Sequence, residues 1–261
     1  YQMTGDEKYV NWMDACFWDV HGEIFDHDAG LFYRDARSKP QKTKNGKKVL
    51  WSRGNVWASG GLTRILKHLP EHHASYARYK ALYVQMAESL AMRQQADGFW
   101  RSNLDDPEQY PMKESSGTGF FCYGITWGIN NGILNREKFL PVAKKAWAAL
   151  ASVVNEDGQV GWSQPAGGGP GKVTEADTSK FGTGIFLLAA SEVFLSTQGE
   201  ALAASKPLGL QPGPNATVLL NGKPYRGIGI NYFNCFLRTL KDGNDTSYDE
   251  GFATLAEKGI P

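Results

Sequence analysis

The stretch Ser116-Gly117-Thr118-Gly119-Phe120-Phe121 follows the turn Asp97-Gly98-Phe99-Trp100, and this pair of signals decides the fold because it occurs three times. The turn recurs as Asp28-Ala-Gly30 and as Asp157-Gly158. The small-residue stretch recurs as Arg53-Gly-Asn55 and as Phe181-Gly-Thr-Gly184. Two signals that recur in step indicate an internal repeat of about 60 residues.

Helical patterns fill the space between these signals. Apolar residues recur at three-and-four spacing before each turn, as in amphipathic helices, over residues 6–25, 75–95 and 136–154. Segments that are apolar on nearly all sides follow each small-residue stretch, as in buried helices, over residues 55–69, 119–131 and 184–196. Thr4 is a candidate N-cap of the first helix. Each repeat is therefore predicted to be an αα-hairpin with an outer and an inner helix.

Buried inner helices favour hairpins that close into a ring over a straight solenoid. Six hairpins of this size need about 360 residues, and the chain holds three. The predicted fold is thus all-α, a partial (α/α)6 toroid over residues 1–205 with a short β-containing C-terminal segment. Tyr1 and the segment Ala256–Pro261 read as cuts within longer elements, so we expect a fragment.

The character of the chain changes after residue 205. Residues 206–217 are rich in proline and glycine and are predicted to be a linker. The stretch Val218–Asn231 reads as a β-hairpin around an Asn221-Gly222 turn. We therefore expect residues 218–261 to open a second domain.

Charge and composition exclude several classes of function. Lys and Arg number 28 against 27 for Asp and Glu, and this net charge of +1 gives no field that holds nucleic acid or an anionic membrane. No apolar run reaches the length of a membrane span, and the start is no signal peptide. Cys16 and Cys122 are predicted to be small core residues, and Cys235 shares no metal-ligand spacing with them. The histidines form no metal motif, so no metal is expected.

In such a ring all inner helices begin on one rim, where free N–H groups and positive dipole ends attract carboxylates. Aromatic residues make up 12% of the chain, a level found with sugar-binding sites and also with aromatic cores. The predicted ligand of this rim is an anionic sugar.

Asp35 follows the first turn in Gly30-Leu-Phe-Tyr-Arg-Asp35. Packing against Phe32 and Tyr33 would raise the pKa of its carboxyl group, as a general acid requires. The alternative is a solvated aspartate beside Arg34. The lysine-rich tip that follows, Lys39–Lys48, is predicted to be solvated.

Each of the other candidates also has an ordinary structural alternative. Arg53, in the block Trp51-Ser-Arg-Gly-Asn-Val-Trp57, either forms a bidentate ion pair with a substrate carboxylate or caps helix ends in the core. A tryptophan at the second turn is a sugar platform or a core residue, and Ser115 or Ser116 binds a ligand or caps a helix. Gly167–Gly171 lacks the lysine of a phosphate-binding loop. The candidate substrate-binding residues are Trp51, Arg53, Asn55, Trp57, Trp100, Glu114, Ser115 and Ser116.

Five motifs together resemble glycoside hydrolase family 105, the unsaturated rhamnogalacturonyl and related uronyl hydrolases, which are cousins of family 88. They are Leu31-Phe-Tyr-Arg-Asp35, Trp51-Ser-Arg-Gly-Asn-Val-Trp57, Gln95-Ala-Asp-Gly-Phe-Trp100, Glu114-Ser-Ser-Gly-Thr-Gly-Phe120 and Gly182-Thr-Gly-Ile-Phe-Leu-Leu188. The resemblance covers about residues 1–197, and Val56 stands where the family's block usually carries glycine.

This resemblance implies an (α/α)6 barrel and an unusual hydrolysis. An acidic aspartate protonates C4 of a 4,5-unsaturated uronic acid at the non-reducing end of a lyase product, water adds at C5, and the hemiketal opens. No metal or organic cofactor is needed, and the oligosaccharide is the only partner implied. Asp35 matches the catalytic aspartate, Trp100 a sugar platform and Arg53 a positioning group, and another important aspartate belongs to hairpins before Tyr1.

Residues 218–261 resemble, over a short stretch, the opening of a family 5 (β/α)8 glycoside hydrolase, which suggests a secreted or periplasmic bacterial protein. The competing functions are a sugar epimerase, a saturated glycosidase and a non-catalytic helical-repeat binding scaffold.

We expect the inner helices to begin near Asn55, Ser116 and Gly182 on one rim, within about 15 Å of Asp35. We also expect the chain alone to be inactive and to self-associate through exposed apolar residues such as Trp12, Phe17 and Trp18.

Overall fold

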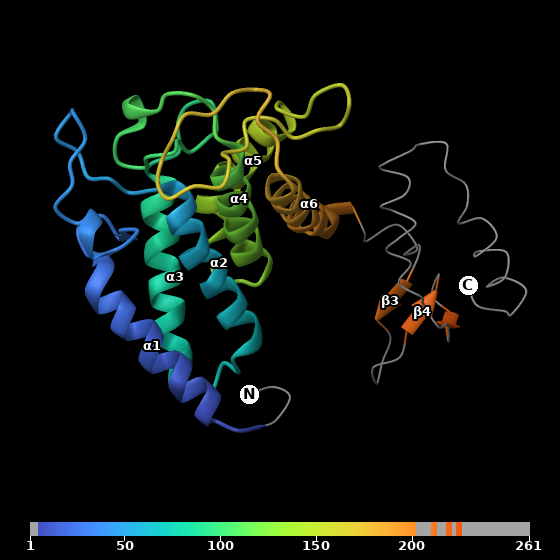
Figure 1. Cartoon of the computed structure of the whole chain (residues 1–261). Coiled ribbons are helices and arrows are strands. Elements are labelled where there is room, and N and C mark those ends of the chain that lie inside the picture. The colour runs from blue at the N-terminus through green and yellow to red at the C-terminus, as the bar shows by residue number, and fades with distance from the viewer. Residues whose placement is uncertain (1–4, 202–209, 213–217, 221–222, 226–261) are drawn as a thin grey trace, which may run out of the picture. The chain divides into compact units, whose positions relative to one another are not determined.

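The computed structural model describes residues 5–201, 210–212, 218–220 and 223–225, which fall into two compact units, 1–199 and 200–261. The first unit is helical (Figure 1). Its elements are α1 (Lys8–Ile24), β1 (Phe25–Asp26), β2 (Leu31–Phe32), the 3₁₀ helix η1 (Ala36–Ser38), α2 (Ser52–His68), α3 (Tyr76–Ala91), the 3₁₀ helix η2 (Pro107–Gln109), α4 (Ser115–Asn130), α5 (Arg136–Ala151) and α6 (Lys180–Ala201).

All six predicted helices are confirmed, and the helical unit has the fold of an α/α toroid. The close helix pairs joined by short turns are α2 with α3 and α4 with α5, so each tight hairpin runs from an inner to an outer helix and not from outer to inner as predicted. The inner helices α2, α4 and α6 begin three or four residues earlier than the apolar pattern predicts, because the small residues themselves form the first helical turn. The N-cap position of α1 is Glu7, which makes no side-chain capping bond. Thr4, the predicted cap, lies outside the described residues.

Glycine is required at the repeated turns and at one helix contact. The turn residues Gly30, Gly98 and Gly158 have φ angles of 64°, 88° and 76°, in the left-handed region that other residues rarely adopt. On α4, a Cβ atom at Gly119 would collide with the side chain of Ile185 on α6. The small-residue stretches therefore allow neighbouring inner helices to approach closely.

The core lies around α4, which is buried along almost its whole length and packs against α2 and α5. This confirms the predicted burial of the second inner helix. The third one differs, because α6 exposes Leu187 and Phe194, each by 60%. On α1, Trp12 is 73% exposed, as predicted, whereas Phe17 and Trp18 are partly buried against Tyr79 of α3.

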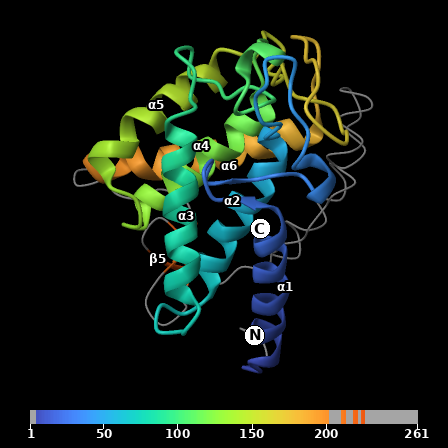
Figure 2. The ribbon, with the colours of Figure 1, turned by 90° about the vertical axis from the view of Figure 1, so that its left-hand side faces the viewer.

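The long connections that lead into the three inner helices gather at one end of the helical unit, at the top of Figures 1 and 2. Residues 33–51 and 92–114 lead into α2 and α4, and residues 152–179 lead into α6. Two of these connections exchange backbone hydrogen bonds, from Ser52 to Ser102 and from Leu104 to Leu50. This end of the unit carries most of the predicted site residues.

The second unit contains three short antiparallel strands, β3 (Leu210–Pro212), β4 (Val218–Leu220) and β5 (Lys223–Tyr225), in the order β3-β4-β5. The pairing of β4 with β5 places Leu220 opposite Lys223, on either side of the Asn221-Gly222 pair that predicts a hairpin. β3 lies inside the segment predicted to be a linker, so part of that segment is paired. The predicted family 5 resemblance concerns mainly residues outside the described ones.

The structure decides both predictions of a cysteine in the core. Cys122 is buried, and this burial raises the pKa of its thiol to about 12. Cys16 is exposed, so its prediction as a core residue is wrong. Cys235 lies outside the described residues. Within the described part, no cluster of His, Cys, Asp and Glu could hold a metal ion, and no helix has the length and apolar character that a membrane crossing requires.

Candidate active site

A pocket of about 300 Å³ lies at the end where the long connections gather. The segment that joins α1 to α2 supplies Arg34, Asp35 and Arg37, and Trp51 comes from the residue before α2. The opposite wall is the glycine-rich stretch Gly168–Pro170, which precedes α6. The pocket therefore joins the first and third repeats of the helical unit.

Asp35 lies in this pocket, but its environment differs from the predicted one. Asp35 is the N-cap of η1, and its carboxylate accepts hydrogen bonds of 3.0 Å from both the backbone N–H and the hydroxyl of Ser38, the last residue of η1. It also pairs with Arg37 at 3.1 Å. Burial acts to raise the pKa of Asp35, but the bonds from Ser38 and the Arg37 guanidinium outweigh it and lower that pKa. The predicted rise is therefore wrong: Asp35 is held ionised.

Arg34 reaches across the pocket mouth toward the opposite wall. Its guanidinium lies 3.8 Å from the Asp35 carboxylate, and its Nη2 atom would be 3.4 Å from a Cβ atom at Gly168. A Cβ atom there would make ordinary van der Waals contact, so the guanidinium lies directly against this glycine. About half of the Arg34 side chain stays exposed, so it is accessible to an anionic ligand.

Arg53, in the first turn of α2, crosslinks the starts of the inner helices. It is 7% exposed, donates to the backbone oxygen of Pro165 at 2.8 Å and to Ser116 Oγ at 3.2 Å, and makes a short bond to the backbone oxygen of Gln164. Desolvation lowers the pKa of Arg53 and the charge of Glu114 raises it. Its Nε atom is buried without a hydrogen-bond partner among the described residues. The core-capping alternative therefore describes Arg53 well, with one donor still unused.

Glu114 organises the start of α4 from the interior. Its side chain is completely buried and accepts bonds from the backbone N–H groups of Ser116 (2.9 Å) and Gly117 (2.7 Å), besides a short bond from the Ser116 hydroxyl. The N-cap of α4 is thus Glu114, and the prediction of Ser115 or Ser116 as the cap is wrong. All three side chains are buried, so the structure does not expose them to a substrate in the pocket.

Asn55 is also an internal residue. Its side-chain amide accepts from the backbone N–H of Phe32 at 2.8 Å and donates to the backbone oxygen of the same residue at 2.9 Å. This pair of bonds ties β2, and with it the segment that carries Asp35, to α2. Asn55 is fully buried, so its predicted role in binding substrate directly is wrong and it positions the pocket wall instead.

The aromatic candidates separate into accessible and buried residues. Trp57 is 58% exposed and lies 5.6 Å from the Phe120 ring and 5.3 Å from the Phe181 ring, so all three inner helices contribute to one aromatic cluster. Trp100 is completely buried, donates to the Leu90 backbone oxygen and packs against Phe121. The prediction of Trp100 as a sugar platform is therefore wrong, and the core alternative holds.

Gln164 is a site residue that the sequence analysis missed. Its side chain accepts from Trp51 Nε1 at 3.0 Å and donates to the Gly169 backbone oxygen at 3.1 Å, and thus connects two walls of the pocket. Two residues earlier, Trp162 has a φ angle of 56°, the only positive value at a non-glycine residue in the described part. Strained backbone of this kind concentrates at functional sites. Neither feature has a sequence signal, because both depend on contacts between distant segments.

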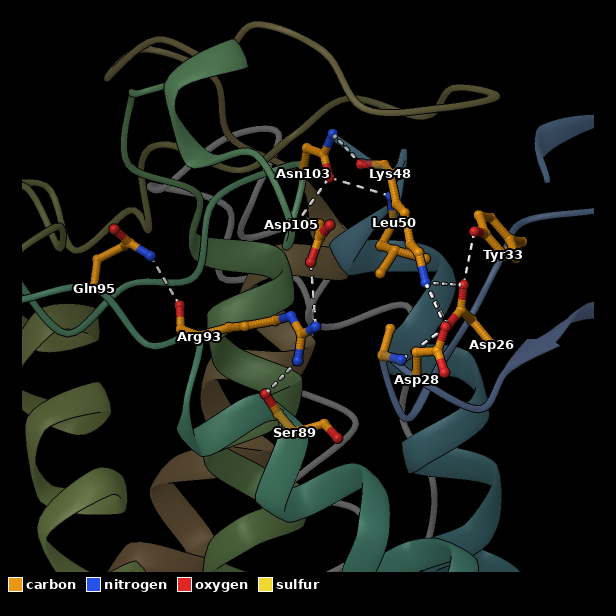
Figure 3. Close-up of polar contacts among 11 residues, drawn as sticks. Asp26, Asp28, Tyr33, Lys48, Leu50, Ser89, Arg93, Gln95, Asn103 and Asp105 are labelled. Atoms are coloured by element: carbon orange, nitrogen blue, oxygen red, sulfur yellow. Dashed lines mark hydrogen bonds and ion pairs between the residues drawn. The ribbon is translucent and has the colours of Figure 1, made fainter. Parts of the chain in front are cut away.

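A second polar cluster fixes the base of the loop that borders the pocket (Figure 3). Lys48 Nζ lies 2.7 Å from Asp26 Oδ1, and the Tyr33 hydroxyl donates to Asp26 Oδ2 at 2.7 Å. Burial alone would raise the pKa of Asp26, but the bonds from Lys48, the Ala29 N–H and Tyr33 lower it to about 2. Arg93 and Asp105 form a separate ion pair at 3.2 Å (Figure 3).

The three inner helices begin at the same end of the unit, as predicted. Trp51, the residue before α2, lines the pocket with Asp35. Arg53 binds Ser116 at the start of α4 and lies over the Phe181 ring, 5.5 Å away, at the start of α6. The predicted limit of about 15 Å from Asp35 stays a prediction.

Several known proteins are similar to this chain. Residues 1–196 match the model of Glycosyl Hydrolase Family 88. Two curated relatives, each named unsaturated 3S-rhamnoglycuronyl hydrolase, come from Alteromonas sp. (strain LOR) and Formosa agariphila. The first is 41% identical over 194 residues, 74% of this chain and 47% of the relative, and the second is 40% identical over 196 residues, 73% and 52%.

A solved structure described as glycosyl hydrolase family 88 from Bacteroides vulgatus is also similar, with 38% sequence identity and a TM-score of 0.72. The alignment covers 75% of this chain and 58% of that one. The chain spans about half the length of the curated relatives it matches. The sequence resemblance named family 105 and its family 88 cousins, and the matching model is that of the second. The chain belongs to glycosyl hydrolase family 88.

Proposed function

We propose that the chain forms part of the active site of a hydrolase that removes a 4,5-unsaturated uronic acid from the non-reducing end of lyase-generated oligosaccharides. The observation that carries this proposal is the pocket itself, in which two partly exposed guanidinium groups, of Arg34 and Arg37, flank a carboxylate and the Trp51 ring. Guanidinium groups bind carboxylates, so these two cations suit a substrate that carries a carboxylate. The names of the two curated relatives support the same substrate class.

The reaction that the family resemblance implies is a hydration. A proton adds to C4 of the unsaturated ring, and the oxygen of a water molecule forms a bond to C5 while the water loses its other proton to a base. The resulting hemiketal opens and releases the remaining saccharide. One water molecule is consumed and no electrons are transferred, so the reaction needs no redox group.

Within this reaction we assign Asp35 to the step that its environment favours. A carboxylate whose pKa is lowered is ionised near neutral pH, so it has no proton to donate to carbon and is in the form that can accept one from water. Asp35 would therefore be the base, and the proton for C4 would come from a second acidic group, the role open to the aspartate that the resemblance places in earlier hairpins. Arg34 would hold the substrate carboxylate, and Trp57 would present its exposed ring to a sugar.

The test uses the absorbance of the conjugated double bond, which hydration destroys. The full-length gene product is expected to erase the absorbance of an unsaturated disaccharide, and Asp35→Asn is expected to slow this by about 10²- to 10⁴-fold, the usual contribution of a proton-transfer group. Asp157→Asn, an exposed carboxylate in the third turn, is the matched control and should keep the full rate. A rate above about a tenth of wild type in Asp35→Asn would remove Asp35 from the chemistry. No loss of absorbance with the wild-type protein would contradict the function itself.

A further inference from the structure

The positive charge of the chain is concentrated in one short segment beside the pocket. Residues 34–48 contain seven Lys and Arg residues and one carboxylate, that of Asp35, and so carry a net charge of +6. The whole chain has a net charge of +1, so the other 246 residues carry −5. A polyanion is therefore attracted to this segment and repelled by the remainder of the chain.

The loop that carries these charges is held in a fixed shape. Thr43 is 8% exposed and its hydroxyl oxygen accepts from the backbone N–H groups of Asn45 (3.2 Å) and Lys47 (3.3 Å). The Asn45 side chain donates to both carboxylate oxygens of Asp106, each at 3.1 Å, and Asp106 is itself 3% exposed. An antiparallel bridge between Lys42 and Lys48 closes the loop. These contacts differ from those of a freely solvated lysine-rich tip.

Three of the lysines have unused charges. Lys42, Lys44 and Lys47, here called the lysine strip, are exposed and form no ion pair with any residue that the structure describes. Two neighbouring lysines are already engaged, Lys39 with Glu23 and Lys48 with Asp26. The strip therefore remains available to a ligand.

The strip begins and ends at the pocket. Gln41 and Val49, the residues on either side of the loop, both line the pocket wall. A chain spans at most about 3.5 Å per residue, so the Cα atom of Lys44 lies within about 11 Å of that of Gln41, and those of Lys42 and Lys47 lie closer to the wall. This distance is about one Debye length at 0.1 M salt, so the three charges attract the part of a bound ligand that extends out of the pocket.

We propose that the lysine strip binds anionic groups on the sugar residues that follow the terminal unsaturated uronate. These groups are oxyanions with a single negative charge, either a sulfate ester or a carboxylate. The proposal rests on the proposed function, because it takes the pocket to hold the terminal uronate. It adds that the enzyme selects polyanionic oligosaccharides over neutral ones, through residues that take no part in the chemistry.

The test compares three unsaturated substrates of the same length, whose following sugar is neutral, sulfated or a uronate. In the triple variant Lys42→Ser, Lys44→Ser and Lys47→Ser, the KM for the charged substrates should rise about 3- to 100-fold, as expected for three exposed ion pairs. The kcat and the KM for the neutral substrate should stay within about twofold. The matched control replaces the exposed Lys67, Lys80 and Lys144 by serine, with the same loss of net charge, and should leave all three KM values unchanged.

Two further measurements complete the test. Replacing the strip by three arginines should keep the preference for charged substrates, because charge and not lysine geometry is required. Binding of the same saccharides, followed by tryptophan fluorescence at low and high salt, gives a readout without turnover. If no substrate is hydrated but the charged saccharides bind in a strip-dependent manner, the proposed function is wrong and the proposal that the lysine strip binds anionic sugars is retained.

Three results would overturn the proposal. One is an equal KM for the neutral and both charged substrates in the wild-type protein. Another is a loss of affinity in the control variant as large as that in the strip variant. The third is strip-dependent binding of double-stranded DNA as strong as that of the saccharides, which would make the strip a general polyanion surface. A difference between the sulfated and the uronate substrate identifies which anion the strip prefers.

Discussion

Replacing Glu114 by alanine should destabilise the helical unit more than any other single truncation of a polar residue in the site. The carboxylate is completely buried and accepts from two backbone N–H groups and one hydroxyl at the start of α4. Through Ser116 Oγ, which donates to Glu114 and accepts from Arg53, it also balances a buried guanidinium charge. One substitution therefore removes a helix cap and the anion nearest to a buried cation.

The magnitude follows from these contacts. Loss of an N-cap costs about 1 kcal/mol, a buried donor without an acceptor about 1–3 kcal/mol, and breaking a buried charge pair about 3–5 kcal/mol. These losses share the same atoms and do not add, so Glu114→Ala should lower the free energy of unfolding by about 3–5 kcal/mol. Glu114→Gln keeps one acceptor but turns an amide N–H₂ toward backbone donors, so its loss should be about 1–3 kcal/mol.

Urea unfolding followed by tryptophan fluorescence measures both losses, and Glu156→Ala, an exposed residue of the third turn, should change the free energy of unfolding by less than about 0.5 kcal/mol. A loss below about 1 kcal/mol in Glu114→Ala would refute this account of the helix start. It would mean that water enters and replaces the carboxylate, or that Arg53 does not depend on it.

Three other predictions follow from the described contacts. The pKa of Asp26 in the folded state is lowered to about 2, so its carboxylate contributes about 2 kcal/mol to the free energy of unfolding above its unfolded pKa. This contribution is lost as the pH falls from about 4 to 2. Asp26→Asn should therefore lower stability at pH 7 and weaken this acid dependence, as measured by urea titrations at several pH values. Lys48→Met, which removes the cation beside Asp26, should shift the acid transition of the protein to higher pH. The chain alone should self-associate and lack activity, and Trp12→Lys with Phe194→Lys should reduce its light scattering; a monomeric wild-type chain would contradict this.

The helices were readable from the sequence because their signals are local. Apolar spacing at three and four residues reports which face of a helix is buried, and an Asp-Gly pair reports a turn with positive φ. These features involve neighbours within one helical turn, and they repeat with the hairpins. For this reason the six helices, the three turns and the common end of the inner helices agree with the prediction.

The chemistry of individual side chains was less readable. The motifs identified the right neighbourhood, since Asp35 and Trp51 line one pocket and Arg53 lies behind it. They did not separate surface from interior. Trp100 has the same turn environment in the sequence as a sugar platform would have, yet its ring fills the space between α3 and α4.

The sequence by itself thus determined the repeat, the helical hairpins and the family, because periodicity and turn chemistry act over a few residues. Only the tertiary structure decided which polar groups face the pocket and which are held inside. Arg53 binds a backbone oxygen 111 residues away, and Glu114 lies beside Ser52, 62 residues away. The low pKa of Asp26 likewise depends on Lys48, 22 residues away. Burial and pKa depend on the distances and orientations of such partners, and these are fixed when the helices pack, not by the order of residues along the chain.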